Sequence, residues 1–161
     1  MDIRKTTLDD FPILMEMYKN ARQFMADHGN KDQWGNSRPG KDVILNDIKE
    51  GSSYVLEHEG EIIATFCYKE GPDSTYAVIE DGNWLNDKPY SVVHRITSTG
   101  KVKGSASYCL NEAVKKSGNL RIDTHKDNYI MQNLLKKLGF TYCGIIYVED
   151  GSKRLAYQKT L

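Results

Sequence analysis

The chain has 161 residues, the size of one compact domain with a single core, and we expect residues 1–161 to form that domain. Its 22 lysine and arginine residues are balanced by 22 aspartate and glutamate residues, so no overall charge draws the protein to nucleic acid or to an anionic membrane. No apolar run approaches the ~20 residues of a membrane span, and the first residues lack an apolar leader core, so we expect a cytoplasmic protein.

The first half of the chain predicts one strand, two helices and an antiparallel meander. Thr7 and Asp10 have the spacing of a capping box at the start of the first helix, and Pro12 is tolerated in its first turn. The polar stretch 31–40 is interpreted as a loop. The expected elements are a strand at 3–6, a helix ending at 28–30, a helix at 42–49, a hairpin of strands at 54–58 and 61–68, and strands at 76–79 and 90–97.

The second half alternates helices and strands. Apolar residues three or four apart predict helices over 106–114 and 131–138, the second ended by Gly139. Further strands are expected at 120–123, 141–148 and 154–159. Two strands joined through a helix form a parallel crossover, so the expected fold class is α/β. It is a mixed sheet with a mostly antiparallel N-terminal meander and a central parallel βαβ crossover.

The cysteines predict neither disulfides nor a metal site. Cys67, Cys109 and Cys143 are odd in number, far apart and without a C-x-x-C pair, so we interpret them as reduced core residues. Asp123 and His125 have ligand chemistry, but the sequence places no third histidine or cysteine with them. We therefore expect no metal.

The segment between residues 94 and 111 predicts a phosphate site. A strand ends there, a turn rich in lysine, glycine and serine follows, and a helix begins. The first amides of a helix have no internal partner and lie at the positive end of its dipole, so they bind phosphate well. Lys101 and Lys103 add positive charge. The chain has neither a P-loop nor a G-x-G-x-x-G motif, so the phosphate ligand is of another kind.

This turn resembles a known family motif. Lys101-Val-Lys-Gly104-Ser-Ala106 is similar to the pyrophosphate loop Q/R-x-x-G-x-G/A of the GNAT superfamily of N-acetyltransferases, with lysine at the first position. The strand at 93–96, then Asp123, Asn128 and Leu138-Gly139-Phe140 follow the order found in that family. The resemblance covers essentially the whole chain. It implies the GNAT acyl-CoA N-acyltransferase fold, with acetyl-CoA as cosubstrate.

The resemblance also implies where acetyl-CoA binds. In the family the cosubstrate lies where the fourth strand splays from the fifth, with its pantetheine arm on strand backbone. The implied cofactor-binding residues are Ile96, Ser98, Lys101, Val102, Lys103, Gly104, Ser105, Ala106, Ser107 and Asn128. A strand amide near Ile96 or Thr97 is the expected donor to the acetyl carbonyl oxygen.

Three residues are candidates for catalysis. An alkylammonium has a pKa near ~10.4, so an amine acceptor must lose a proton before it attacks. His94 matches a strand position where some family members carry a general base, and the alternative is a histidine hydrogen-bonded within the sheet. Glu80 could act through water or lie at a solvated hairpin tip. Asn128 matches an asparagine near the cofactor, and it could also serve as a helix N-cap.

The acceptor is expected to be the primary amine of a small molecule, with a peptide amine as the other choice. The substrate-binding candidates are Trp34, Glu80, Trp84 and Tyr90, which offer aromatic faces and a carboxylate. Trp34 could equally be a lid over the core edge. Neither nucleic acid nor a membrane is an expected partner, and homodimerisation is left open.

The sequence departs from the family pattern in two places. The tyrosine that protonates the departing thiolate in many members is replaced by Leu135, so Tyr142, Tyr147 or water would have to act instead. The stretch between Ser98 and Lys101 is two residues shorter than the common loop. A second function therefore stays open, that of a catalytically silent GNAT-fold module that binds acetyl-CoA or a protein partner.

Overall fold

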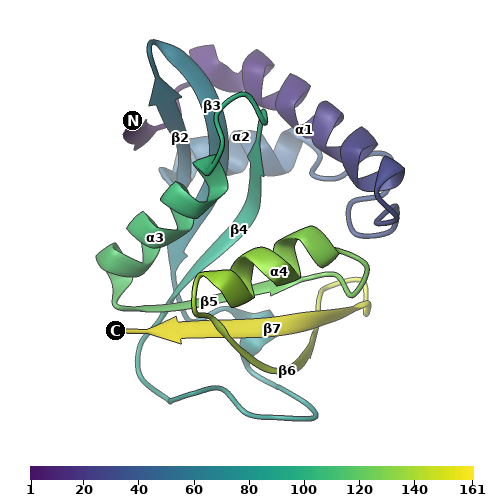
Figure 1. Cartoon of the computed structure of the whole chain (residues 1–161). Helices are drawn as coiled ribbons and strands as arrows, with labels where there is room; N and C mark the ends of the chain where they lie inside the picture. The colour runs from purple at the N-terminus through teal and green to yellow at the C-terminus, as the bar shows by residue number, and fades with distance from the viewer.

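The computed structural model describes all residues from 1 to 161 and is built on a seven-stranded sheet of order β1-β2-β3-β4-β5-β7-β6. Its elements are β1 (Asp2–Lys5), η1 (Leu8–Asp10), α1 (Phe11–Asp27), α2 (Lys41–Glu50), β2 (Ser53–His58), β3 (Glu61–Glu70), η2 (Ser74–Tyr76), β4 (Ser91–Ser98), α3 (Ser105–Ser117), β5 (Asn119–Thr124), α4 (Tyr129–Lys137), β6 (Thr141–Tyr147) and β7 (Lys153–Thr160) (Figure 1).

Local signals in the sequence set most of these boundaries. The backbone N–H of Thr7 donates to the Asp10 carboxylate at 2.8 Å, which confirms the capping box ahead of α1. Glu59 and Gly60 both have positive φ, 53° and 79°, as a two-residue hairpin turn between β2 and β3 requires. The second helical pattern ends with Gly139 at φ 85°, just after the end of α4.

The helices cover both faces of the sheet. One hydrophobic core joins α1 and α2 to β2 and β3 through residues such as Leu14, Ile44 and Val55. The larger core lies between the other face and α3 and α4, and contains Leu110 and Leu135. Cys67, Cys109 and Cys143 are buried and free, which confirms their interpretation as reduced core residues.

The pairing of β4 with β5 is the feature that positions the site. It is the one parallel pair of the sheet and extends over only two positions, Ser91 with Leu120 and Val92 with Arg121. Beyond Val92 the strands diverge, and Figure 1 shows β4 running toward one end of the molecule while β5 crosses it. The expected fold class, a mixed α/β sheet with an antiparallel first half and a central parallel crossover, is confirmed.

The strand expected at residues 76–79 is wrong. Residues 71–90 form a long connection that contains η2 and a single bridge between Glu80 and Ile145. Tyr76 is 1% exposed and packs with Val92, Ile146 and Ala156 in a third core cluster. Tyr76 and Ile79 pack into this cluster while Val78 is exposed, so the apolar residues here reflect local burial rather than strand pairing. A connection this long is uncommon unless it serves a site.

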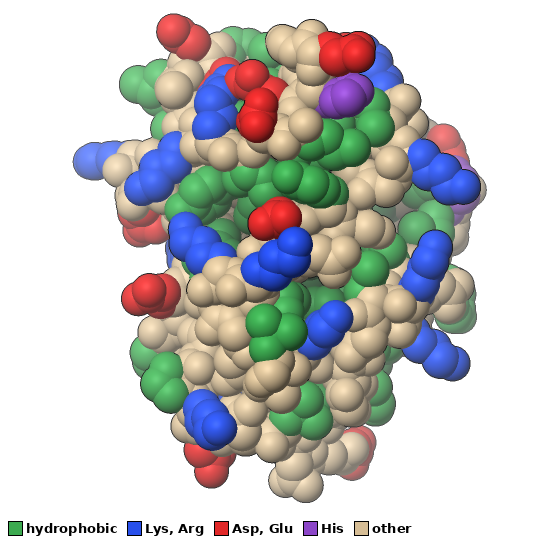
Figure 2. Space-filling model, turned by 60° about the vertical axis from the view of Figure 1, so that its left-hand side comes forward, with side chains coloured by type: hydrophobic (Ala, Val, Ile, Leu, Met, Phe, Trp, Pro, Cys, Tyr) green, Lys and Arg blue, Asp and Glu red, His purple; other side chains and the backbone are tan.

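One face of the molecule shows no dominant charge. Figure 2 shows lysine and arginine side chains interspersed with acidic ones, with hydrophobic side chains gathered in the upper half of this face. No helix combines the length and the apolar character that a membrane span needs.

Candidate functional site

Two cavities open beside β4 and meet where β4 and β5 separate. The smaller has a volume of about 760 Å³ and is lined by α2, by the connection after β3 and by the ends of β5 and β7. The larger, about 1270 Å³, is lined by α1, the end of β4, the turn after it and α4. Residues common to both linings are Met25, Ile96, Asn128 and Met131. Each volume suits a small organic ligand, and the shared residues put the two ligand sites in contact.

A β-bulge in β4 lies at this junction. Thr65 of β3 pairs with Thr97 and Cys67 pairs with His94, so two residues of β4 face one residue of β3. Arg95, one of the two, has a φ of 53°, which a non-glycine residue adopts only when its surroundings impose it.

Two buried side chains impose that backbone conformation. The Tyr18 hydroxyl donates to the carbonyl oxygen of Arg95 at 2.7 Å. The Arg95 guanidinium donates to both carboxylate oxygens of Asp47, at 2.8 and 2.9 Å, and Asp47 is only 3% exposed. Such a bidentate pair fixes orientation as well as charge. The helices α1 and α2 therefore hold the bulge in place from one side of the sheet.

The larger cavity follows β4 into the turn before α3. Predicted cofactor residues that line it are Ile96, Ser98, Lys101, Ala106 and Asn128. Gly104 is the N-cap of α3 with φ 82°, and the first amides of the helix beyond it have no partner within the helix. The Lys101 ammonium forms an ion pair with Glu61, the first residue of β3.

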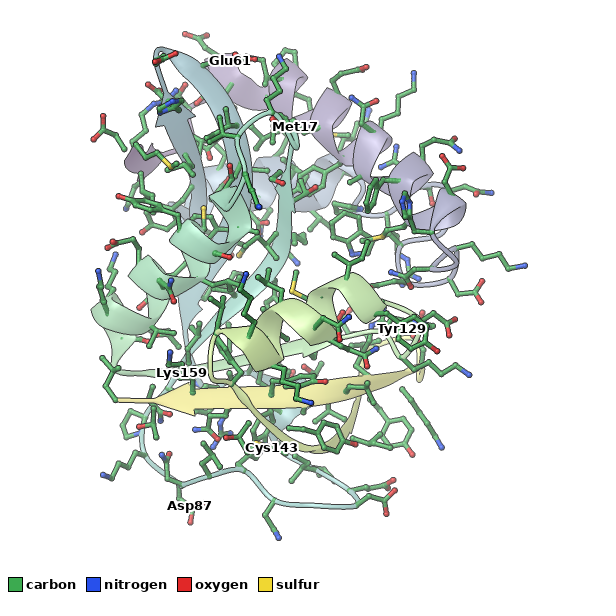
Figure 3. The ribbon with its side chains drawn as sticks, viewed as in Figure 1. Met17, Glu61, Asp87, Tyr129, Cys143 and Lys159 are labelled. Atoms are coloured by element: carbon green, nitrogen blue, oxygen red, sulfur yellow. The ribbon has the colours of Figure 1, made fainter.

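Of the other predicted cofactor residues, Val102 packs against the main core. The rest lie in the turn and the first helical turn without lining either cavity: Lys103, Gly104, Ser105 and Ser107. Tyr129, two-thirds exposed, lines the larger cavity from the start of α4, where Figure 3 labels it.

His94 lines the smaller cavity and has a carboxylate partner that sequence analysis missed. Its Nε2 lies 2.8 Å from Oδ2 of Asp73, and both side chains are about four-fifths buried. Burial alone would raise the pKa of Asp73, but the hydrogen bonds from His94 and Thr75 and the charge of His94 outweigh it and lower the pKa. Asp73 is therefore ionised at neutral pH and holds the imidazole by a charge-assisted contact.

Asp73 is itself held by its own turn. Its Oδ1 accepts from the amide and the hydroxyl of Thr75, at 2.9 and 2.7 Å. Its backbone N–H donates to the Tyr90 hydroxyl at 2.9 Å. The pattern Asp-x-Thr after Gly71-Pro72 signals such a side-chain turn, but no sequence signal pairs it with a histidine 21 positions away.

A second polar chain runs along the same wall. The Tyr76 hydroxyl donates to Oδ2 of Asp123 at 2.6 Å, and the Tyr76 ring centroid lies 6.0 Å from that of His94. Asp123 lies opposite Arg154 of β7, whose Nε is 3.9 Å from Oδ1. Burial is the main cause that raises the pKa of Tyr76, and the Asp123 charge adds to it, so the phenol stays protonated.

Asn128 is the N-cap of α4. Its Oδ1 accepts from the Met131 amide at 3.0 Å, and its Nδ2 donates to Oε1 of Gln33 at 2.9 Å. The N-cap interpretation is thus confirmed, and the same side chain ties α4 to the 31–40 loop. It lines both cavities at their junction.

Of the four acceptor-binding candidates, only Trp34 lines a cavity. Trp34 lines the smaller cavity and packs edge-on against Tyr18, with ring centroids 5.5 Å apart. Glu80, Trp84 and Tyr90 line neither cavity. The last two pack on Tyr76 and on the guanidinium of Arg121, and the Glu80 carboxylate accepts from the exposed Tyr147 hydroxyl.

None of the residues considered from sequence as proton donors to the departing thiolate lies where the two cavities meet. Leu135 is fully buried in the main core. Tyr142 and Tyr147 lie on β6 and line neither cavity. No group of three or more histidine, cysteine or acidic side chains is arranged to hold a metal ion.

Comparison of sequence alone finds no matching family model and no matching curated protein. The structure, however, matches a GNAT-family acetyltransferase from Streptococcus agalactiae with a TM-score of 0.91 and 30% identity, over 99% of this chain and 95% of that one. A GNAT-family acetyltransferase from Listeria monocytogenes matches with a TM-score of 0.72 and 20% identity, over 99% and 94% of the two chains.

A phosphinothricin acetyltransferase from Sinorhizobium meliloti, solved with acetyl-CoA, matches with a TM-score of 0.66 and 14% identity, over 99% of this chain and 88% of that one. At these lower identities the Listeria and Sinorhizobium proteins share the fold. The Streptococcus protein is similar in sequence as well.

Proposed function

Because the chain belongs to the GNAT family of acetyltransferases, we propose that it transfers the acetyl group of acetyl-CoA to a primary amine of a small molecule. The observation that carries the proposal is the meeting of two cavities at the β4–β5 split, beside the His94–Asp73 pair. One cavity suits a long cofactor and the other a small acceptor. Direct transfer in a ternary complex needs this arrangement.

The larger cavity is the proposed site of acetyl-CoA, which would supply the acetyl group as a thioester. Backbone groups of Ile96 and Ser98 would bind its pantetheine arm, and the turn 101–107 would bind its pyrophosphate. The free amides at the start of α3 and the lysines of the turn match the charge of a diphosphate. Lys101 would exchange its ion pair with Glu61 for that phosphate.

His94 is the proposed general base. With Asp73 accepting from Nε2, the neutral imidazole carries its proton on Nε2 and leaves Nδ1 free to take a proton from the acceptor ammonium. Asp73 stabilises the imidazolium that results, and Tyr90 and Thr75 hold Asp73. Asn128 is proposed to position the groups at the cavity junction. Glu80 and Trp84 take no part at the reacting centre.

Water is the proposed proton source for the departing thiolate. A thiol has a pKa of about 8.5, so the thiolate is a tolerable leaving group without a protein acid. The core position of Leu135 then does not prevent turnover.

Titration with acetyl-CoA, followed by an assay of free CoA thiol over a panel of amines, tests this function. In the His94→Ala variant we expect kcat to fall by roughly 10²- to 10⁴-fold with little change in acetyl-CoA affinity. The control is His58→Ala, because His58 lines neither cavity.

Tight acetyl-CoA binding without thiol release from any amine would favour the catalytically silent module. If the wild-type protein does not bind acetyl-CoA, both functions are refuted. An unchanged pH profile in His94→Ala would refute the role of His94.

A further inference from the structure

Arg154 is a buried cation whose hydrogen-bonding capacity is only partly used. It is 6% exposed, lines the smaller cavity from β7, and its Nη1 has no hydrogen-bond partner. Thr124 Oγ1, which belongs to the same cavity lining, is also buried without a partner. An unpaired polar group in a protein interior costs free energy, so this wall of the cavity is prepared for a ligand.

The acid nearest to Arg154 does not neutralise it fully. The distance of 3.9 Å from Nε to Oδ1 of Asp123 exceeds hydrogen-bond length, and Oδ2 of Asp123 is taken by the Tyr76 hydroxyl. Burial lowers the pKa of Arg154, and the Asp123 charge offsets this only in part. The guanidinium therefore lacks an anion within hydrogen-bond distance.

A second guanidinium converges on the same point. Nη2 of Arg154 and Nη2 of Arg38 both donate to the carbonyl oxygen of Gln33, at 3.0 and 3.2 Å. Arg38 is half-exposed at the rim, and its other terminal nitrogen, Nη1, binds Asp150 at 3.1 Å. Two guanidinium groups on one carbonyl oxygen concentrate positive charge there, and Nη1 of Arg154 stays unpaired, which suits a carboxylate or a phosphate.

The other charges of the cavity disfavour a dianion, because acidic side chains outnumber basic ones in its lining. The acids are Asp42, Asp47, Asp73, Asp123, Glu149 and Asp150, and the cations are Arg38, Lys69, Arg95 and Arg154. Asp47 and Asp73 are engaged by Arg95 and His94, so neither competes for Arg154. Asp123 and the rim acid Asp150 lie next to the two arginines and would repel a dianion. A carboxylate therefore fits this site better than a phosphate does.

Resting on the proposed acetyl transfer, we propose that the acceptor amine also carries a carboxylate, as an amino acid does, and that Arg154 binds this carboxylate with help from Arg38. His94 and Arg154 line the same cavity, and Asp123 lines it beside Arg154, with the buried Tyr76 behind the wall between Asp123 and His94. One small molecule then places its amine at His94 and its carboxylate at Arg154.

The test compares free L-amino acids with their carboxamides, at saturating acetyl-CoA, by thiol release and by mass spectrometry of the product. The carboxamide keeps the amine and the size but removes the charge. In the wild-type protein kcat/KM should be at least roughly 10-fold higher for the acids. Arg154→Gln should lower kcat/KM for the acids by roughly 10- to 100-fold, mainly through KM, and leave the carboxamides and acetyl-CoA affinity unchanged.

Two more variants sharpen the result. Arg38→Gln should act in the same direction with a smaller effect, and it decides the question if Arg154→Gln does not fold, because Arg38 is half-exposed. Lys153→Gln is the control, because Lys153 is exposed, precedes Arg154 in β7 and lines neither cavity. Its kcat/KM for acids and carboxamides should equal that of the wild type.

Equal acetylation of acids and carboxamides, or a preference for diamines without a carboxylate, would overturn the inference and leave acetyl transfer standing. Failure to bind acetyl-CoA would remove the proposed function and the inference with it.

Discussion

At the scale of single residues, the site depends on side chains that hold other side chains. The position of Asp73 relative to His94 is fixed, because Thr75 donates to the Asp73 carboxylate and Tyr90 accepts from its backbone amide. Arg95 is held in a strained conformation by Asp47 and Tyr18. Strain at a site persists when several contacts impose it together, and here they come from two different helices, α1 and α2.

Asp73→Asn tests the positioning role of the carboxylate. We expect kcat to fall by roughly 10- to 100-fold, since an amide neither orients nor stabilises the imidazolium as a carboxylate does. Acetyl-CoA affinity should not change.

Asp87→Asn is the control for that variant. Asp87 is an exposed residue of the same connection, labelled in Figure 3, and lines neither cavity. A purely structural role for Asp73 would lower the free energy of unfolding and leave the kcat of the folded variant unchanged, and that result would contradict the assignment.

At the scale of elements, the two ends of α3 have different proposed roles: the N-terminal end contacts acetyl-CoA, and the C-terminal end only closes the helix. Gly104 and Gly118 flank it with φ values of 82° and 69°, and an added Cβ would meet no atom within 4 Å at either position. The backbone cost of a side chain should therefore be similar at the two ends, roughly 1–2 kcal/mol. Only the N-terminal end is proposed to contact acetyl-CoA.

Gly104→Ala should weaken acetyl-CoA binding by roughly 10-fold, because the left-handed conformation that orients the first amides becomes unfavourable. Gly118→Ala should lose a similar amount of stability and keep wild-type affinity. Isothermal titration gives the affinity, and urea unfolding gives the stability. Equal losses of affinity in the two variants would show that the effect comes from stability rather than from the phosphate turn.

At the scale of the whole molecule, folding stability is linked to pH through partly buried carboxylates. The pKa of Asp10 is lowered to about 2, mainly by its hydrogen bond to Arg4 and further by the Thr7 contacts. An unfolded aspartate has a pKa near ~3.9, so the ionised form stabilises the fold. This contribution is complete above about pH 5 and is lost as the pH falls through the folded pKa.

Asp10→Asn should therefore flatten the dependence of unfolding free energy on pH between about 4 and 2, and cost roughly 1–2 kcal/mol at pH 7. Urea denaturation at a series of pH values measures both. A variant whose stability declines with pH as steeply as the wild type would show that Asp10 does not contribute to this loss.

The sequence by itself determined the elements and the turn before α3. Three local features depend on residues only a few positions apart: capping at Thr7, the hairpin at Glu59-Gly60 and the helical stripes. Such short-range patterns can be recognised from the sequence alone. The one failed element, at residues 76–79, failed because burial by distant strands replaced strand pairing.

Only the tertiary structure decided which side chains meet. Asp73 lies 21 positions from His94, and Gln33 lies 121 positions from Arg154. No local pattern specifies such pairs, because the short β4–β5 pairing and the packing of the 31–40 and 71–90 connections bring them together. For the same reason, composition could suggest Glu80, Trp84 and Tyr90 as acceptor residues, while the fold turned them away from the cavities.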